Sequence, residues 1–174
     1  EECVDAQPAP PVSSETKVEG NVSPSLPPDP VIQRAIPSWV CPVEEWINRN
    51  DTRMACIPSS NGFGNARAVA KHYAALIGKG VDGVRLLSEA TVVAATLWNH
   101  EIDGLIPGNG RWGLGYSLRG TDDVPGMVFG HDGYGGATGF ADMHRELAIG
   151  VLKERMGGDI TQQIIKTIFR CIDE

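Results

Sequence analysis

Five glycines surround a single histidine between residues 129 and 139, and this run limits the possible folds of the chain more than any other feature. Its sequence is Phe-Gly-His-Asp-Gly-Tyr-Gly-Gly-Ala-Thr-Gly. Glycines beside a strand let a substrate or another backbone approach exposed N–H groups closely, and a histidine can carry charge near neutral pH. The run therefore indicates either one wall of a site around His131 or a glycine-rich bend with a polar histidine at its edge.

Two helices are predicted before this run. Apolar residues recur at three- and four-residue steps from 66 to 77, which predicts an amphipathic helix. Ser60 or Asn61 is expected to cap its start, and Gly78 and Gly80 to end it. Ser88 is expected to cap a second helix that continues to about residue 98.

After residue 104 the pattern changes from helix to strand. Residues 112–118 alternate between large apolar side chains and glycine or serine, which predicts one strand. Residues 127–129 predict a short strand. A hairpin is predicted from 137–142 and 147–153, with its turn at 143–146.

The last segment predicts the most regular amphipathic helix of the chain. Asp159 with Gln162 three residues later resembles a capping box, and isoleucines then recur at helical spacing up to Ile172. The predicted order is two helices, three or four antiparallel strands and a helix that covers the sheet. This order indicates the α+β class.

The first 35 residues differ from the rest in composition. Nine of the twelve prolines fall within residues 1–42, and residues 1–30 carry a net charge of -5. Such a segment has too few apolar anchors to offset its ordering entropy. We therefore predict a disordered, proline-rich acidic linker at 1–35 and a folded domain at 36–174. The linker and the absence of an initiator Met lead us to expect further sequence upstream.

Composition also bears on partners and compartment. The remainder of the chain carries a net charge of only -2, which offers no electrostatic footprint for nucleic acid or anionic lipid. No window approaches 18 consecutive apolar residues, so no membrane span is predicted. The four cysteines form no Cys-x-x-Cys pair, so thiols in a reducing, intracellular environment are expected, with one disulfide left open. They are Cys3, Cys41, Cys56 and Cys171.

Nucleotide and metal sites find little support. The chain has no phosphate-binding Gly-x-x-x-x-Gly-Lys-Ser/Thr run. His131, Asp132, Asp142 and His144 are close in sequence, but the predicted hairpin would place His144 at its tip, away from His131. We therefore expect neither a metal nor another cofactor.

Residues 57–98 and 111–156 resemble the C-terminal half of the serine β-lactamase-related family, which includes class C β-lactamases, D-Ala-D-Ala carboxypeptidases and related esterases. The resemblance implies a β-lactamase/transpeptidase-like fold, of which the chain would hold the C-terminal half with an antiparallel sheet flanked by helices. The stretches that carry it are Ile57–Ala70, Asp82–Ser88, Phe129–Gly136, Gly139–Asp142 and Leu147–Leu152.

The same resemblance implies roles for four residues. His131, Asp132 and Gly133 stand where members carry Lys-Thr-Gly or His-x-Gly, a triplet on the edge strand that forms one wall of the active site. Its basic residue helps to bind the substrate carboxylate. The backbone N–H of Tyr134 would be one of two donors to the oxyanion.

Two family motifs are missing or misplaced. Ser-x-x-Lys occurs only at Ser14 to Lys17, inside the predicted linker, and no tyrosine begins a Tyr-x-Asn motif. We therefore expect a segment of a hydrolase that acts on a small-molecule ester or amide. It would be inactive alone and completed by a missing N-terminal half or upstream domain. The alternative is a non-catalytic interaction module that completes a sheet with another chain.

Overall fold

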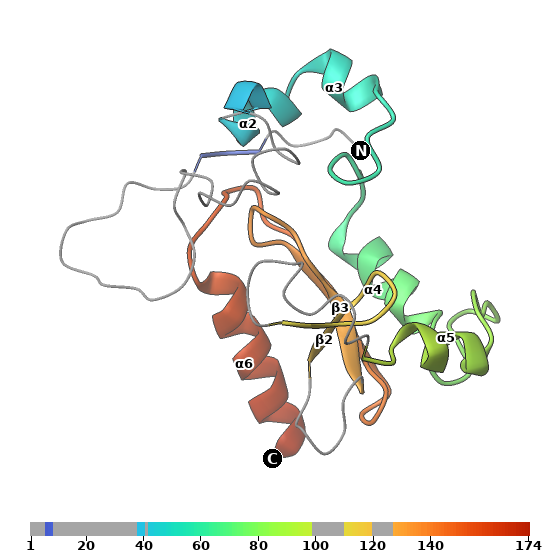
Figure 1. The fold of residues 1–174 in the computed structure, drawn as a ribbon. Coiled ribbons are helices and arrows are strands. Elements are labelled where there is room, and N and C mark those ends of the chain that lie inside the picture. The colour runs from blue at the N-terminus through green and yellow to red at the C-terminus, as the bar shows by residue number, and fades with distance from the viewer. Residues whose placement is uncertain (1–5, 9–37, 41, 99–109, 120–126) are drawn as a thin grey trace. The chain divides into compact units, whose positions relative to one another are not determined.

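The computed structural model describes residues 6–8, 38–40, 42–98, 110–119 and 127–174 (Figure 1). Of the linker predicted at 1–35, only residues 6–8 are among the described residues. The described residues divide into two compact units. One contains the described residues up to Phe63 together with Tyr134–Gly136 and Lys153–Glu174, and the other contains those of Gly64–Gly133 and Ala137–Leu152.

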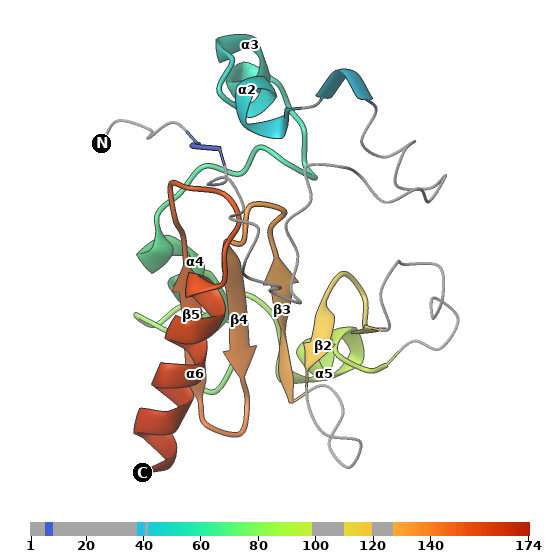
Figure 2. The same ribbon diagram turned by 90° about the vertical axis from the view of Figure 1, so that its left-hand side faces the viewer.

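The second unit is built on an antiparallel sheet of five strands, in which each strand pairs with its neighbours in the sequence (Figure 2). Together with its helices this sheet confirms the predicted α+β class. The strands are β1 (Arg111–Trp112), β2 (Ser117–Arg119), β3 (Val128–Asp132), β4 (Thr138–Asp142) and β5 (Leu147–Val151).

The prediction of one continuous strand at 112–118 was wrong. The segment folds back on itself as the hairpin β1–β2, in which Trp112 pairs with Ser117. The Gly113 N–H donates to the Tyr116 carbonyl at 2.9 Å, and Gly115 between them has a φ of 83°. Glycine reaches this left-handed region without a steric penalty, so the alternating glycines serve a turn rather than an extended strand.

The predicted hairpin between β4 and β5 is confirmed, with its turn at residues 143–146. The Asp142 carboxylate is fully buried and closes this turn. Its Oδ1 accepts hydrogen bonds from the backbone N–H groups of His144 and Arg145 at 2.9 and 3.0 Å. Its Oδ2 accepts from the Arg145 guanidinium at 2.9 Å. The same carboxylate therefore holds the backbone of the turn and pairs with a positive charge.

The first helix of this unit, α4 (Ala66–Ala74), begins later than expected. Its cap is Asn65, whose side chain accepts from the Ala68 N–H at 2.9 Å. Asn61 instead accepts from the Ile57 N–H at 3.1 Å and closes the preceding loop. Ser60 and Asn61 are therefore not the cap, because glycines at 62 and 64 keep the chain out of the helix until Asn65.

Helix α5 (Glu89–Ala95) has the predicted cap. The Ser88 hydroxyl accepts from the Thr91 N–H at 3.1 Å. Both helices end earlier than expected, α4 three residues before Ile77 and α5 three before Trp98. The segment after α4 continues as turns that bury Leu76 and Ile77, so its apolar spacing reflects burial more than helical structure.

Two glycines let α4 lie close against the sheet. Gly139 on β4 and Gly150 on β5 are directly paired, and both face the helix. A methyl group at Gly139 would lie 2.5 Å from carbon atoms of Val69 and Tyr73, and one at Gly150 would lie 2.5 Å from the Ala66 carbonyl oxygen. The helix therefore packs into a groove that only glycine leaves open.

The core of this unit forms around that contact. Phe129 has no exposed surface, and its ring lies 5.1 Å from the Tyr116 ring and 6.3 Å from the Tyr73 ring, measured between centroids. Helix α5 contributes Val92. The buried cluster consists of Tyr73, Leu76, Ile77, Val92, Leu118, Phe129 and Ala141.

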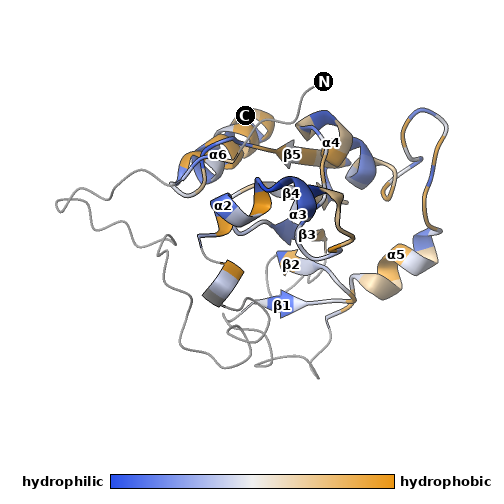
Figure 3. Ribbon diagram, turned by 90° about the horizontal axis from the view of Figure 1, so that it is seen from above, coloured by the Kyte–Doolittle hydropathy of each residue, from blue (hydrophilic) through white to orange (hydrophobic). Residues whose placement is uncertain are grey.

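The first unit contains the predicted C-terminal helix, α6 (Ile160–Asp173), with hydrophobic and hydrophilic residues alternating around it (Figure 3). Asp159 precedes this helix but makes no capping hydrogen bond to the backbone. Its carboxylate instead accepts from the Gln163 side chain at 2.6 Å, so the predicted capping box was wrong. The other helices are η1 (Ser38–Val40), α2 (Val43–Ile47) and α3 (Asn50–Met54).

A short piece of the N-terminal segment belongs to the same unit. The Gln7 N–H donates to the Glu154 carbonyl and the Met156 N–H to the Gln7 carbonyl, both at 2.9 Å. The Asn48 side chain accepts from the Ala6 N–H at 3.0 Å and donates to the Ala6 carbonyl at 2.9 Å. In the part of the chain that the structure describes, no helix has the length and apolar character needed to cross a membrane.

The glycine groove leads to a prediction about stability. Gly150→Ala should destabilise the chain by about 2 kcal/mol, because the added methyl group meets the backbone of α4, which cannot move aside cheaply. Gly64→Ala is the matched control, since nothing lies within 4 Å of the added carbon. Urea unfolding followed by circular dichroism measures both variants. Equal stability of the two would contradict the close packing.

Candidate active-site wall

His131 and Asp132 form the end of β3, which is longer than the strand predicted at 127–129. Both residues are exposed. The expectation of an edge strand needs correction, because β3 lies between β2 and β4 in the sheet. Strand β2 stops where Ser117 pairs with Gly130, so among the described strands only β4 pairs with the last two residues of β3.

The backbone of this strand end has a definite direction. The Gly133 N–H donates to the Ala137 carbonyl at 2.7 Å, and the Met143 N–H donates to the Met127 carbonyl at 2.8 Å. In an antiparallel ladder such pairs alternate, so the odd-numbered residues of β3 point their amides toward β4. The Asp132 amide therefore points to the opposite side, where no described strand pairs with it.

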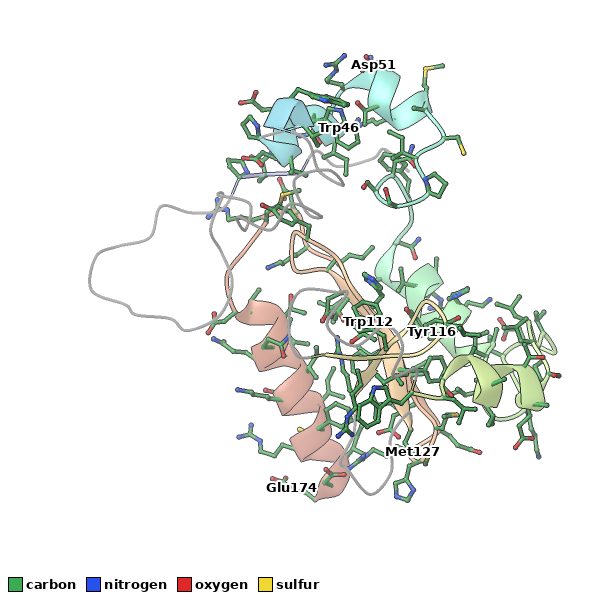
Figure 4. All side chains as sticks on the ribbon, in the orientation of Figure 1. Trp46, Asp51, Trp112, Tyr116, Met127 and Glu174 are labelled. Atoms are coloured by element: carbon green, nitrogen blue, oxygen red, sulfur yellow. The ribbon has the colours of Figure 1, made fainter. Side chains whose placement is uncertain are left out.

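The Trp112 ring lies against one side of the His131 side chain. Its Nδ1 lies 2.7 Å from the Asp132 carbonyl oxygen, and its ring meets the Trp112 ring edge-on at 5.4 Å between centroids. Trp112 and Tyr116 are labelled in Figure 4. Trp112 comes from β1, so the short β1–β2 hairpin restricts where the imidazole can point.

Asp132 is engaged on the other face of the sheet. Its carboxylate pairs with the Arg119 guanidinium and accepts from the Thr138 hydroxyl at 2.5 Å. Arg119 also lies over the Phe140 ring, 5.1 Å from its centroid. Because successive side chains of a strand point to opposite faces, this carboxylate and the His131 ring emerge on different sides. Asp132 thus links β2, β3 and β4.

Tyr73 lies beneath His131, on helix α4, and only 8% of it is exposed. Burial raises the pKa of its hydroxyl above the ordinary 10.0, and the nearby Tyr116 acts in the same direction. The backbone N–H of His131 opposes this rise in pKa. The sequence showed Tyr73 only as one residue of an apolar helical stripe, so its place near His131 was not predicted.

An open depression of about 160 Å³ lies between α4 and this strand end. Its residues all belong to the second unit. They are Val69, Tyr73, His131, Gly133, Ala137, Thr138, Gly139 and Leu152.

Tyr134, the residue predicted to supply an oxyanion donor, belongs to the first unit together with Gly135 and Gly136. It is exposed and lies in a turn. In that unit the Gly157 N–H donates to the Gly135 carbonyl at 3.0 Å, and the Thr161 hydroxyl donates to the Gly136 carbonyl at 2.7 Å.

The other singled-out residues are dispersed. Asp142 pairs with Val128 at the start of β3, so the turn with His144 follows at the opposite end of the hairpin from His131. Cys56 and Cys171 are exposed free thiols. Cys3, Cys41 and the segment from Ser14 to Lys17 lie outside the described residues.

The raised pKa of Tyr73 predicts a loss of stability at alkaline pH. The unfolded chain releases this proton near pH 10, whereas the folded chain retains it, so the stabilisation is complete below that pH and is lost as the pH rises toward the folded pKa. In Tyr73→Phe the free energy of unfolding should fall less between about pH 8 and about pH 11.

Tyr134→Phe is the control, because 57% of Tyr134 is exposed, and it should retain the wild-type alkaline slope. Unfolding curves at both pH values measure the difference. Identical slopes in all three proteins would show that Tyr73 is not protected from ionisation.

No family model matches the sequence. A curated relative, the esterase/beta-lactamase LipL of Mycobacterium tuberculosis (strain H37Rv), is 35% identical over 106 residues, which cover 58% of this chain and 24% of the relative. The chain thus spans about a quarter of the length of the curated relative it matches. Over the matched region, the chain is similar to this esterase/beta-lactamase.

Proposed function

We propose that this chain supplies one wall of the active site of a serine hydrolase that acts on a small-molecule ester or amide. The observation that supports this most strongly is the exposed end of β3, where His131 stands beside an open depression and the Asp132 amide points to a side without a described strand. The attacking serine would come from a missing N-terminal half or an upstream domain.

The proposed chemistry is acyl transfer. The serine hydroxyl attacks the substrate carbonyl while a base takes its proton, and the alcohol or amine leaves with a proton. Water then releases the acid from the acyl-enzyme. Negative charge develops on the carbonyl oxygen, where a preorganised N–H donor lowers the barrier by about 3 kcal/mol. The family resemblance assigns one such donor to the Tyr134 N–H, and in this proposal His131 contacts the substrate.

Asp132 has a different part in the proposal. Its carboxylate is engaged by Arg119 and Thr138 on the other face of the sheet, so it holds the strand end in register rather than contacting substrate. Gly133 carries no side chain that could block close approach, and a methyl group there would make ordinary contact with Ala137 at 3.5 Å. In this triplet His131 thus contacts the substrate, Asp132 holds the strand in register and Gly133 leaves space for the substrate.

The chain alone should be catalytically silent, because Ser-x-x-Lys occurs only at Ser14 to Lys17 in a proline-rich segment, and positioned catalytic groups act as a unit. We expect no turnover of a chromogenic cephalosporin or of nitrophenyl esters, and no labelling by a fluorophosphonate. Mass spectrometry would locate any label. A label on Ser14 would mean that this segment, and not an absent one, carries the nucleophile.

A chimera tests the wall directly. In it the matched region of this chain replaces the corresponding region of the M. tuberculosis relative, and we expect hydrolysis of nitrophenyl esters. His131→Ala should lower kcat/KM about a hundredfold, and His131→Lys should retain much of the activity because it keeps a basic residue there. His144→Ala, at the far turn of the hairpin, is the control and should match the parent chimera.

The outcomes separate the two functional hypotheses. A folded chimera whose activity is the same with His131 and with alanine would remove the proposed role of this residue. A folded chimera without any hydrolysis would favour the alternative, in which the chain is an interaction module and completes a sheet with another chain.

A further inference from the structure

The depression beside β3 exists because the residues around the turn between β3 and β4 have very small side chains. Gly133, Ala137 and Gly139 contribute at most a methyl group each. Its floor is closed by α4, since the position of a methyl group on Gly139 would already overlap Val69 and Tyr73. Leu152, which is 40% exposed, stands at its margin.

The lining is largely apolar. No carboxylate, lysine or arginine side chain is among the eight lining residues, and the Asp132 carboxylate is engaged on the opposite face of the sheet. The lining residues with polar side chains are Tyr73, His131 and Thr138, and the Thr138 hydroxyl donates to Asp132 on the opposite face of the sheet. An apolar group placed here would gain contact with Val69 and Leu152.

The size of the depression limits its occupant. The depression is open to solvent and measures about 160 Å³, which is close to the ~150 Å³ that accommodate benzene in an enclosed cavity. It therefore has room for a phenyl ring or a short alkyl chain. It is smaller than the ~300 Å³ or more typical of whole-ligand pockets, so it suits one part of a substrate.

We propose that this depression holds the acyl chain of the substrate, which is a short, uncharged chain of up to about the volume of benzene. The assignment rests on the proposed function. His131 and Gly133 form both the reactive wall and one side of the depression, so a chain that continues from a carbonyl carbon at the wall can enter it directly. Ala137 and Leu152 then set the length limit.

Binding can be tested on the chain itself without catalysis. Hexanamide is a neutral, unreactive analogue of the acyl group, and its titration should shift the amide NMR signals of Gly133, Ala137 and Gly139 with a Kd on the order of 1 mM. Dodecanamide, which is too long, should bind at least about fivefold more weakly. Equal binding of the two amides would overturn the proposal.

Filling the depression gives the matched variants. Ala137→Leu and Leu152→Trp should each weaken hexanamide binding about tenfold. Leu114→Trp is the control, because Leu114 is 65% exposed in the β1–β2 turn and does not line the depression, and it should bind as the wild type does. Two filling variants are used so that a folding defect in one leaves the other informative. If folded filling variants bind hexanamide normally, the site lies elsewhere.

The activity of the chimera shows whether the acyl chain or the alcohol of the ester occupies the depression. With a constant nitrophenyl group, Leu152→Trp should shift the preferred acyl chain from hexanoyl toward acetyl, and a series that varies only the alcohol should be unchanged. A shift confined to the alcohol series would overturn the assignment to the acyl chain. An inactive chimera whose parent chain still binds hexanamide at these residues would contradict the proposed function but not the site.

Discussion

The close contact between α4 and the paired glycines of β4 and β5 is the constraint on which the second unit depends. Gly139 and Gly150 remove side-chain volume from adjacent strands at the same level, so Val69 and the backbone of α4 occupy space that a side chain would otherwise fill. Tyr73 then reaches the sheet and joins Phe129 in the core. Glycine in a strand costs conformational entropy, and here the helix-to-sheet packing offsets that cost.

This contact also determines what stands next to His131. With α4 held near the sheet, Tyr73 and Val69 form a floor below the end of β3. On the opposite face Arg119, Asp132 and Thr138 connect three consecutive strands. The strand end is thus fixed from both faces, and no described strand pairs with it on the side to which its Asp132 amide points.

The sequence predicted the types of these elements better than their limits. The Ser88 cap, the β4–β5 hairpin and the C-terminal helix follow local chemistry and were predicted correctly. The cap of α4 was misplaced because several residues before it could accept a backbone N–H, and only the fold shows that Asn61 is used elsewhere. The strand at 112–118 was misread because alternating glycines are as compatible with a tight turn as with an extended strand.

The proposed site shows the same division between local and long-range information. The glycines beside His131 predicted a strand end that a substrate or another backbone could approach closely, and the structure shows that this end is exposed. Tyr73 lies on α4, Trp112 on β1 and Arg119 on β2. No spacing in the sequence relates these three residues to His131. They act on the strand end through burial, ring contact and charge pairing. The groups that contact this strand end therefore all belong to the chain described here, and its local structure depends on no other chain.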